Sequence, residues 1–169
     1  MALSGYAIAR IPACASTRTS PVPGSPEYEL ARSLRHTHFF SLLVVRPDAP
    51  PGKAGLERLA ATIAGHMRGT DVASRRGEAD FWLILPETPS DAARVVGERI
   101  RLALGAEQLG GSVSIGIACF PEDGVSAREL AAAVQRALAH AVELGGNRTV
   151  LHSVRGDAPP GWGLRRDVA

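Results

Sequence analysis

One stretch of the sequence decides the fold: Arg68-Gly69-Thr70-Asp71-Val72-Ala73-Ser74-Arg75-Arg76-Gly77-Glu78-Ala79-Asp80-Phe81. The residues before it, from Lys53, have an amphipathic helical pattern whose apolar face carries Leu56, Leu59, Ala60, Ile63 and Met67. The residues after it, 81–85, form an apolar run that is typical of a buried strand and is closed by Pro86. Arg68 and Asp71 therefore lie three residues apart where a helix gives way to a strand, and both side chains can point into one shared space.

Strands and single helices alternate on either side of this stretch. Residues 39–45, 113–118 and 149–151 are short apolar runs, and each predicts a further strand. The region between residues 26 and 153 therefore predicts one α/β sheet covered by helices. Residues 1–25 and 154–169 are rich in Pro, Ser, Gly and Ala without periodicity, and we interpret them as a flexible leader and a flexible tail.

Three more helices are predicted from caps and apolar stripes. Residues 25–35 begin with Ser-Pro-Glu, which suits a helix start. A second helix begins at Ser90, with one face formed by Ala93, Val96, Ile100, Ala103 and Leu104. Ser126 and Glu129 have the spacing of a capping box, and Gly145-Gly146 ends the helix that follows. Its buried stripe is expected to be Leu130, Val134, Ala137, Leu138 and Ala141.

Composition excludes several classes of protein. The chain has 169 residues, enough for one globular domain with a real core, and a net charge of +2 that does not by itself indicate a nucleic-acid surface. Its two cysteines, Cys14 and Cys119, have neither a CxxC nor a metal-site spacing, and Cys119 lies in an apolar run that predicts a buried free thiol. No export signal and no membrane-length apolar run is present, so we expect a cytoplasmic protein without membrane insertion.

Several motifs, in order and at near-constant spacing, resemble those of GGDEF domains, the bacterial diguanylate cyclases that make cyclic di-GMP from two GTP. The segment 71–81 matches the family signature and the strand that leads into it. The other matching motifs are Gly52-x-x-x-Leu56-x-x-x-Ala60, Ser114-Ile115-Gly116-Ile117-Ala118, Pro121-x-Asp123-Gly124 and Gly145-Gly146-Asn147-Arg148. The resemblance implies an α/β (α+β) fold of the nucleotidyl-cyclase type. Its mostly antiparallel sheet would have about five strands, covered by helices, around a ferredoxin-like βαββαβ core.

The same resemblance implies that the catalytic site is lost. Family members hold divalent metal with a carboxylate at the third signature position and an aspartate that ends the first strand. Here the third position is Ala79, and the strand end is Arg46, a fixed positive charge. Asp48 and Asp80 remain, and we expect them to be isolated carboxylates that cannot replace the metal site.

The substrate contacts of the family are altered as well. The signature is Gly77, Glu78, Ala79, Asp80 and Phe81, so that Glu78 puts bulk and negative charge where a second glycine lets a nucleotide approach the backbone. Residues 49–51, Ala-Pro-Pro, replace the family's guanine-reading segment, and Val142 stands in place of a phosphate-binding lysine. The sequence therefore predicts no catalytic residue, no metal and no cofactor.

The family's product-binding motif, Arg-x-x-Asp, is intact as Arg68 and Asp71. Arginine can donate two bonds to the O6/N7 edge of guanine and can pair with phosphate, while a carboxylate can accept from the opposite edge of the base. The resemblance adds Arg99, on the helix after the signature, and Arg32 as the arginine that a partner domain would contribute. We expect these four residues to bind cyclic di-GMP.

Less specific interpretations exist for the same residues. Arg68 and Asp71 could form a surface salt bridge, which would contribute little. Arg75 matches a frequent family residue and Arg76 is expected to be solvated. His36 and His38 have no third metal ligand nearby, and Trp82 is expected to pack in the core rather than to stack on a base.

Three functions follow in order of preference. The first is a non-catalytic cyclic di-GMP receptor that signals through homodimerisation or a partner protein, in a system such as exopolysaccharide or motility control. The second is a structural or protein-interaction module derived from a diguanylate cyclase that needs no nucleotide. The third is weak retention of GTP binding at the old active site.

Overall fold

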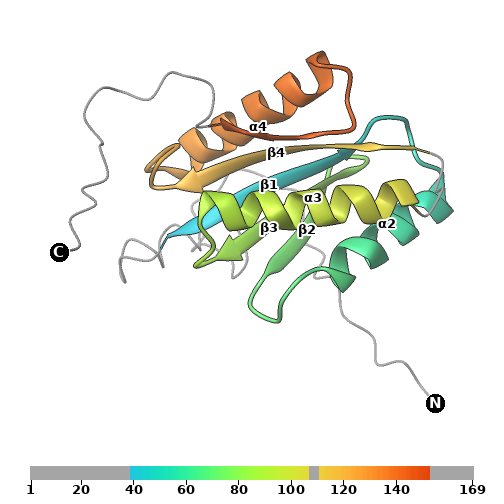
Figure 1. The fold of residues 1–169 in the computed structure, drawn as a ribbon, viewed down its shortest axis with the longest axis horizontal. Helices are drawn as coiled ribbons and strands as arrows, with labels where there is room; N and C mark the ends of the chain where they lie inside the picture. The colour runs from blue at the N-terminus through green and yellow to red at the C-terminus, as the bar shows by residue number, and fades with distance from the viewer. Residues whose placement is uncertain (1–38, 107–110, 153–169) are drawn as a thin grey trace, which may run out of the picture.

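The structure, a computed structural model, describes residues 39–106 and 111–152. Five strands form one sheet in the order β2-β3-β1-β4-β5, and three helices cover it (Figure 1). The strands are β1 (Phe40–Pro47), β2 (Val72–Arg76), β3 (Asp80–Pro86), β4 (Val113–Phe120) and β5 (Thr149–Leu151). The helices are α2 (Lys53–Gly65), α3 (Ser90–Ala106) and α4 (Ala127–Glu143).

The sheet is mixed and mostly antiparallel, as the sequence predicted. β1 lies at its centre and pairs antiparallel with both β3 and β4, and β2 pairs antiparallel with β3. β5 pairs parallel with β4. From β1 to β4 the elements follow the predicted βαββαβ order, and the expected fold class is confirmed.

The core has two layers because β1, β3 and β4 are buried on both faces. One face, with Leu43, Val45, Leu83 and Ile117 among others, packs under α2 and α3. The opposite face packs under α4 through Phe40, Leu42, Val44, Trp82 and residues of the predicted α4 stripe. Figure 1 shows α2 and α3 side by side on one face of the sheet and α4 on the other.

Local signals for the helices are confirmed with small shifts in their bounds. Ser126 and Glu129 form the predicted capping box of α4, and Gly145 and Gly146 leave the helix with φ values of +101° and +72°. α2 ends at Gly65, before Met67, although Met67 still packs against the first core face. β3 and β4 extend one or two residues beyond the predicted apolar runs, β1 begins one residue later and ends two residues later than predicted, and β5 has the predicted bounds.

Some predictions lie outside the described residues. They are the helix at residues 25–35 with Arg32, the histidines at 36 and 38, Cys14, the leader and the tail. Within residues 39–106 and 111–152, no helix is long and apolar enough to cross a membrane.

Candidate functional site

The hairpin between β2 and β3 carries residues 77–81, the segment that resembles the GGDEF signature. Gly77 has a φ of +63°, which a glycine adopts without strain, and it starts the turn that joins the two strands. Glu78 is exposed at the tip, and Ala79 and Asp80 are partly buried. Arg76 lies 4.9 Å over the ring of Trp82, which is only 8% exposed. The prediction that Trp82 packs in the core is therefore confirmed, whereas Arg76 is engaged on its ring rather than simply solvated.

Asp80 is not an isolated carboxylate, contrary to the sequence prediction. Its two oxygens accept hydrogen bonds from Nε and Nη2 of Arg46, at 2.8 and 2.6 Å. β1 and β3 pair antiparallel with Val45 opposite Phe81. Arg46, which follows Val45, therefore lies opposite Asp80, which precedes Phe81. The bond with Asp80 raises the pKa of the Arg46 guanidinium further. Arg46 therefore occupies the Asp80 carboxylate of the signature, while Glu78 lies exposed at the tip.

Asp48 is not an isolated carboxylate either, although the sequence predicted that it would be. Its carboxylate accepts hydrogen bonds from the hydroxyls of Ser112 and Ser114 and, at 3.0 Å, from the backbone N–H of Asn147. A Cβ added at Gly146 would lie 2.9 Å from an Asp48 oxygen, so Asp48 fills the space that a side chain at position 146 would need. Asp48 thus ties the end of β1 to the start of β4 and to the turn after α4.

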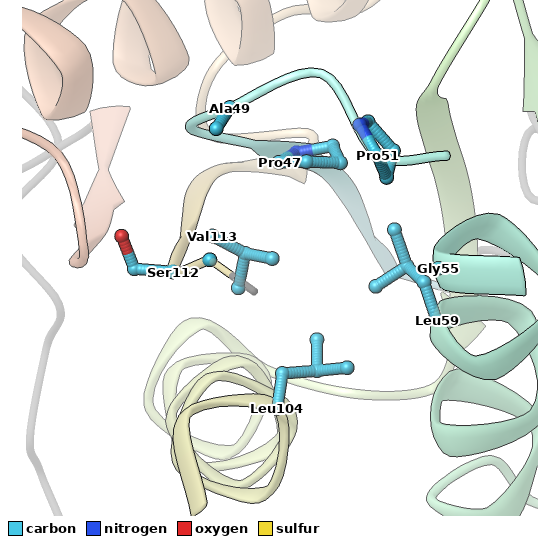
Figure 2. A pocket seen from close by; sticks show the side chains of 9 residues that line it. Pro47, Ala49, Pro51, Gly55, Leu59, Leu104, Ser112 and Val113 are labelled. Carbon is cyan, nitrogen blue, oxygen red and sulfur yellow. The ribbon is translucent and has the colours of Figure 1, made fainter. Parts of the chain in front are cut away.

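A small pocket lies beside this edge, between α2 and α3 (Figure 2). Its volume is about 40 Å³, far below the several hundred Å³ of typical small-molecule sites. Ser112 is its only lining residue with a polar side chain; the others are Pro47, Ala49, Pro51, Gly55, Leu59, Leu104, Gly111 and Val113. This pocket offers neither the room nor the donors that would recognise a guanine base.

Arg68 and Asp71 form a tight turn between α2 and β2. The Asp71 carboxylate accepts a hydrogen bond of 2.7 Å from the backbone N–H of Arg68, and the Asp71 N–H donates to the Arg68 carbonyl at 3.0 Å. The two side chains do not form an ion pair with each other, and the exposed Arg68 guanidinium has no partner among the described residues. The turn fixes the carboxylate while leaving the guanidinium available.

Arg99 is exposed on α3, three residues after Val96. Residues three apart lie on the same side of a helix, so Arg99 is on the side of α3 that carries Val96. Val96 packs against the same core cluster as Met67 and the buried residues of α2. The pocket brings Gly55 and Leu59, in the first half of α2, together with Leu104 near the end of α3, so the start of α2 lies near the end of α3. The end of α2, which Arg68 follows, therefore lies towards the first half of α3.

Comparisons with known proteins identify the family of this chain and relatives that share its fold. A family model described as "Diguanylate cyclase, GGDEF domain" matches residues 51–148, more than half of the chain. The chain belongs to the GGDEF family. Diguanylate cyclase A of Treponema denticola is 30% identical over 107 residues, which are 59% of this chain and 29% of that protein. The chain thus spans less than a third of the length of this relative.

Solved GGDEF structures share the fold. The coiled coil and GGDEF domain of DgcB from Caulobacter crescentus, in complex with c-di-GMP, has a TM-score of 0.69 and 20% identity, covering 75% of this chain and 76% of that one. The active GGEEF domain of a diguanylate cyclase from Vibrio cholerae has a TM-score of 0.69 and 19% identity, with 75% and 91% covered. Diguanylate cyclase SiaD of Pseudomonas aeruginosa, in complex with its activator SiaC, has a TM-score of 0.67 and 22% identity, with 75% and 55% covered.

The described part of this GGDEF domain contains no group of three or more His, Cys, Asp and Glu side chains arranged to hold a metal ion. Ala79 has no ligand atom, Asp80 is bonded to Arg46, and Asp48 is bonded to the two serines and Asn147. The residues at the hairpin therefore do not fit the metal that family members use.

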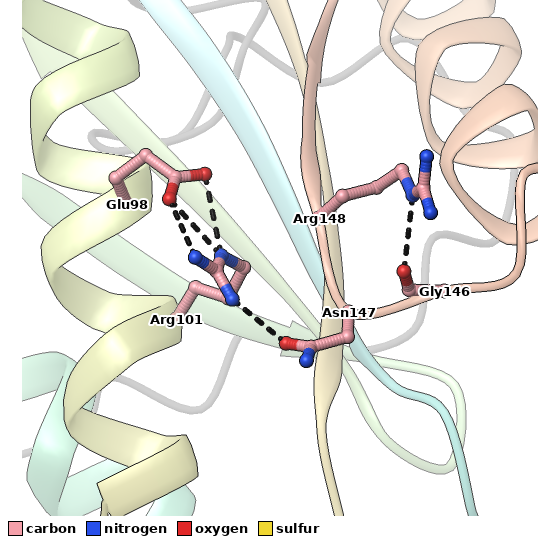
Figure 3. Close-up of polar contacts among 5 residues, drawn as sticks. All are labelled: Glu98, Arg101, Gly146, Asn147 and Arg148. Atoms are coloured by element: carbon pink, nitrogen blue, oxygen red, sulfur yellow. Dashed lines mark hydrogen bonds and ion pairs between the residues drawn. The ribbon is translucent and has the colours of Figure 1, made fainter.

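Sequence reasoning missed a polar cluster that links α3 to β5 (Figure 3). Arg101 bonds Glu98 within α3 and reaches Asn147, in the turn before β5, at 2.9 Å. The three-residue spacing of Glu98 and Arg101 is a signal for a helical ion pair. Nothing in the sequence alone indicates that Asn147, 46 residues away, is their third member.

Proposed function

We propose that this GGDEF domain is a non-catalytic receptor for cyclic di-GMP, acting in the cytoplasm. The observation that carries the proposal is the turn at Arg68 and Asp71, where a hydrogen-bonded carboxylate lies beside an exposed guanidinium that has no partner among the described residues. The pair offers donors and acceptors for the two edges of guanine, and the guanidinium can also contact phosphate. Arg99 would add a second positive charge from α3.

The absence of catalysis is proposed on the chemistry of the hairpin. Joining two GTP needs a divalent metal to neutralise phosphate charge and to activate the attacking oxygen. Arg46 brings a permanent positive charge bonded to Asp80, and Ala79 offers no ligand. Glu78 adds negative charge at the exposed tip, where a triphosphate would approach. Weak GTP binding without turnover is a less favoured outcome.

The output of the receptor would be a contact with a second copy or with a partner protein. The solved complex of SiaD with its activator SiaC shows that another GGDEF protein has a protein partner. In this chain, Val95 and Leu102 of α3 are 53% and 59% exposed on the outer surface of the helix that carries Arg99. These apolar side chains also favour the second candidate, a protein-interaction module that needs no nucleotide.

Calorimetric titration with cyclic di-GMP separates the two candidates. The wild type should bind with micromolar affinity or better. Arg68→Ala and Asp71→Ala should each weaken binding by about 1.5 kcal/mol or more, as expected for charge-assisted hydrogen bonds. Arg128→Ala, which removes an exposed arginine of α4, is the matched control and should bind as the wild type does. A wild type that binds no cyclic di-GMP would leave the interaction module as the function.

Incubation with GTP and Mg²⁺ tests the loss of catalysis separately. No cyclic di-GMP should form, even at high enzyme concentration and long incubation times. Any turnover that is clearly above a protein-free blank, and that is lost on Asp80→Ala, would overturn the assignment of the hairpin as inactive.

A further inference from the structure

Arg101 holds α3 and the turn before β5 together. Its Nη2 and Nε donate to Oε2 of Glu98 at 2.8 and 3.1 Å, and its Nη1 donates to Oδ1 of Asn147 at 2.9 Å. The side chain is only 19% exposed. A guanidinium this far removed from water is costly unless it is well paired, and here two different elements supply its partners.

The backbone at Asn147 is held in place by its own hydrogen bond to Asp48. Asn147 has a φ of +50°, a left-handed conformation that asparagine tolerates better than most residues. Its backbone N–H donates to Asp48, whose carboxylate is bonded to Ser112 and Ser114 of the neighbouring segment. Arg101 is therefore attached to a turn that is tied to the end of β1 and to the start of β4.

A close approach of α3 to β5 accompanies these bonds. A Cβ added at Gly97 would lie 3.0 Å from Cγ2 of Thr149, so the backbone of the helix packs closely against this side chain of β5 one turn before Arg101. Glu98 and Arg101 are on this β5 side of α3 (Figure 3). Arg99 is two residues from Arg101, about 200° around the helix, and so lies on the side of α3 that faces away from β5.

We propose that Arg101 is a positioning residue for the cyclic di-GMP site. Its bonds to Glu98 and Asn147 fix the rotation of α3 against β5, and this rotation sets where Arg99 stands relative to Arg68 and Asp71. Arg101 itself makes no contact with the ligand. The inference rests on the proposed receptor function. It identifies Glu98, Arg101 and Asn147, on the β5 side of α3, as the residues that hold the helix in place for ligand binding.

Two variants remove the contact from opposite ends. Arg101→Ala deletes the donor, and Asn147→Gly deletes the acceptor while keeping a residue that adopts positive φ. Each should lower the affinity for cyclic di-GMP by about 2- to 30-fold, the range for residues that act through a packed network. The double variant should lose no more than the larger single loss, because both substitutions break one contact. Additive losses would overturn the proposal.

Salt dependence distinguishes positioning from direct contact. Arg99→Ala removes a charge that would face the ligand's phosphates, so its affinity should depend less on salt concentration than that of the wild type. Arg101→Ala should keep the wild-type salt dependence. Arg101→Lys keeps the positive charge but cannot bond Glu98 and Asn147 in the same geometry as a guanidinium, so it should still bind cyclic di-GMP more weakly than the wild type. A reduced salt dependence in Arg101→Ala would identify Arg101 as a ligand contact and overturn the proposal.

Hydrogen exchange of the unliganded variants gives a readout that does not need the ligand. Arg101→Ala and Asn147→Gly should both increase exchange in α3 and the turn at residues 145–148, while Arg128→Ala should not. Unchanged exchange would contradict the positioning role. If the wild type binds no cyclic di-GMP, the receptor function and the effect on affinity both fail, and the exchange data then decide whether Arg101 fixes α3.

Discussion

Arg46 and Asp80 are joined by two parallel hydrogen bonds of 2.8 and 2.6 Å, across the paired ends of β1 and β3. The positive charge of the Arg46 guanidinium thus neutralises the negative charge of the Asp80 carboxylate at this edge of the sheet. The side chains are 42% and 21% exposed, so solvent screens much of their attraction. The pair is therefore expected to contribute little to the stability of the fold.

A double-mutant cycle should therefore give a small coupling energy. Arg46→Ala, Asp80→Ala and the double variant, compared by urea denaturation at low salt, should yield a coupling of about 1 kcal/mol or less. The coupling should shrink in 0.5 M NaCl, because partly exposed charges are screened. A coupling that is several times larger, or one that salt does not reduce, would show that the pair is better shielded than its exposure indicates.

The same pair should prevent a single substitution from creating a metal site at the hairpin. Ala79→Asp alone should not create Mn²⁺ binding, because Arg46 would remain bonded to Asp80 and would repel the ion. Arg46→Asp combined with Ala79→Asp would place carboxylates at positions 46, 79 and 80, and we expect Mn²⁺ binding that is measurable by electron paramagnetic resonance. Arg46→Asn with Ala79→Asn is the control of similar shape and should not bind. Binding by the Ala79→Asp single variant would contradict this account.

The sequence predicts most of the fold because its strongest signals are local. Apolar runs define β1, β3 and β4, and one capping box and two glycines define the ends of α4. These features depend on residues within a few positions of one another, so they can be identified without knowing how the chain folds. The end of α2 was misplaced by two residues because Met67 continues the apolar spacing after the helix has ended.

The state of the two leftover carboxylates was not predictable in the same way. Arg46 and Asp80 are 34 residues apart, and their contact depends on the register between β1 and β3. Asp48 bonds Asn147 across 99 residues, because two strands and a turn converge at one edge of the sheet. Resemblance to a family identifies which positions have changed, but the new partners of the changed residues appear only in three dimensions.

Gly116 should be the least tolerant glycine of the described core. A Cβ at this position would lie 2.5 Å from both the backbone nitrogen of Leu138 and the carbonyl oxygen of Val134, so α4 would have to move away from β4. We expect Gly116→Ala to lower the free energy of unfolding by about 3 kcal/mol or more, as overpacking against backbone does. Thermal or urea denaturation measures the loss.

Gly105→Ala is the matched control for that measurement. Gly105 lies in α3 with no atom within 4 Å of an added Cβ. Alanine has the higher helix propensity, so the control should be neutral or stabilising by up to about 1 kcal/mol. Similar losses in both variants would show that α4 does not pack directly on β4 at Gly116.

Cys119 should be chemically silent in the folded protein. Its thiol is buried, and desolvation raises its pKa to about 12, although a hydrogen bond between Cys119 and Ser41 acts in the opposite direction. Very little thiolate is present near neutral pH, and reagents cannot reach the sulfur. In a Cys14→Ser background, Ellman's reagent should react with Cys119 only at the rate of unfolding, and completely in urea. Fast reaction of the native protein would mean that the strand opens locally.

The Glu98–Arg101 pair should give the stability of the domain a component that depends on pH. The hydrogen bond from Arg101 holds the pKa of Glu98 below its ordinary value. A carboxylate whose pKa is lowered in the folded state stabilises the fold above its unfolded pKa, about 4.3, and loses this contribution as pH falls through the lower, folded pKa. The stability difference between the wild type and Glu98→Gln should therefore be largest from about pH 5 to 7 and should decrease towards pH 3. The same comparison in an Arg101→Ala background should be much less dependent on pH. Urea denaturation at several pH values measures both differences, and equal pH dependence in the two backgrounds would mean that Arg101 is not the residue that lowers the pKa of Glu98.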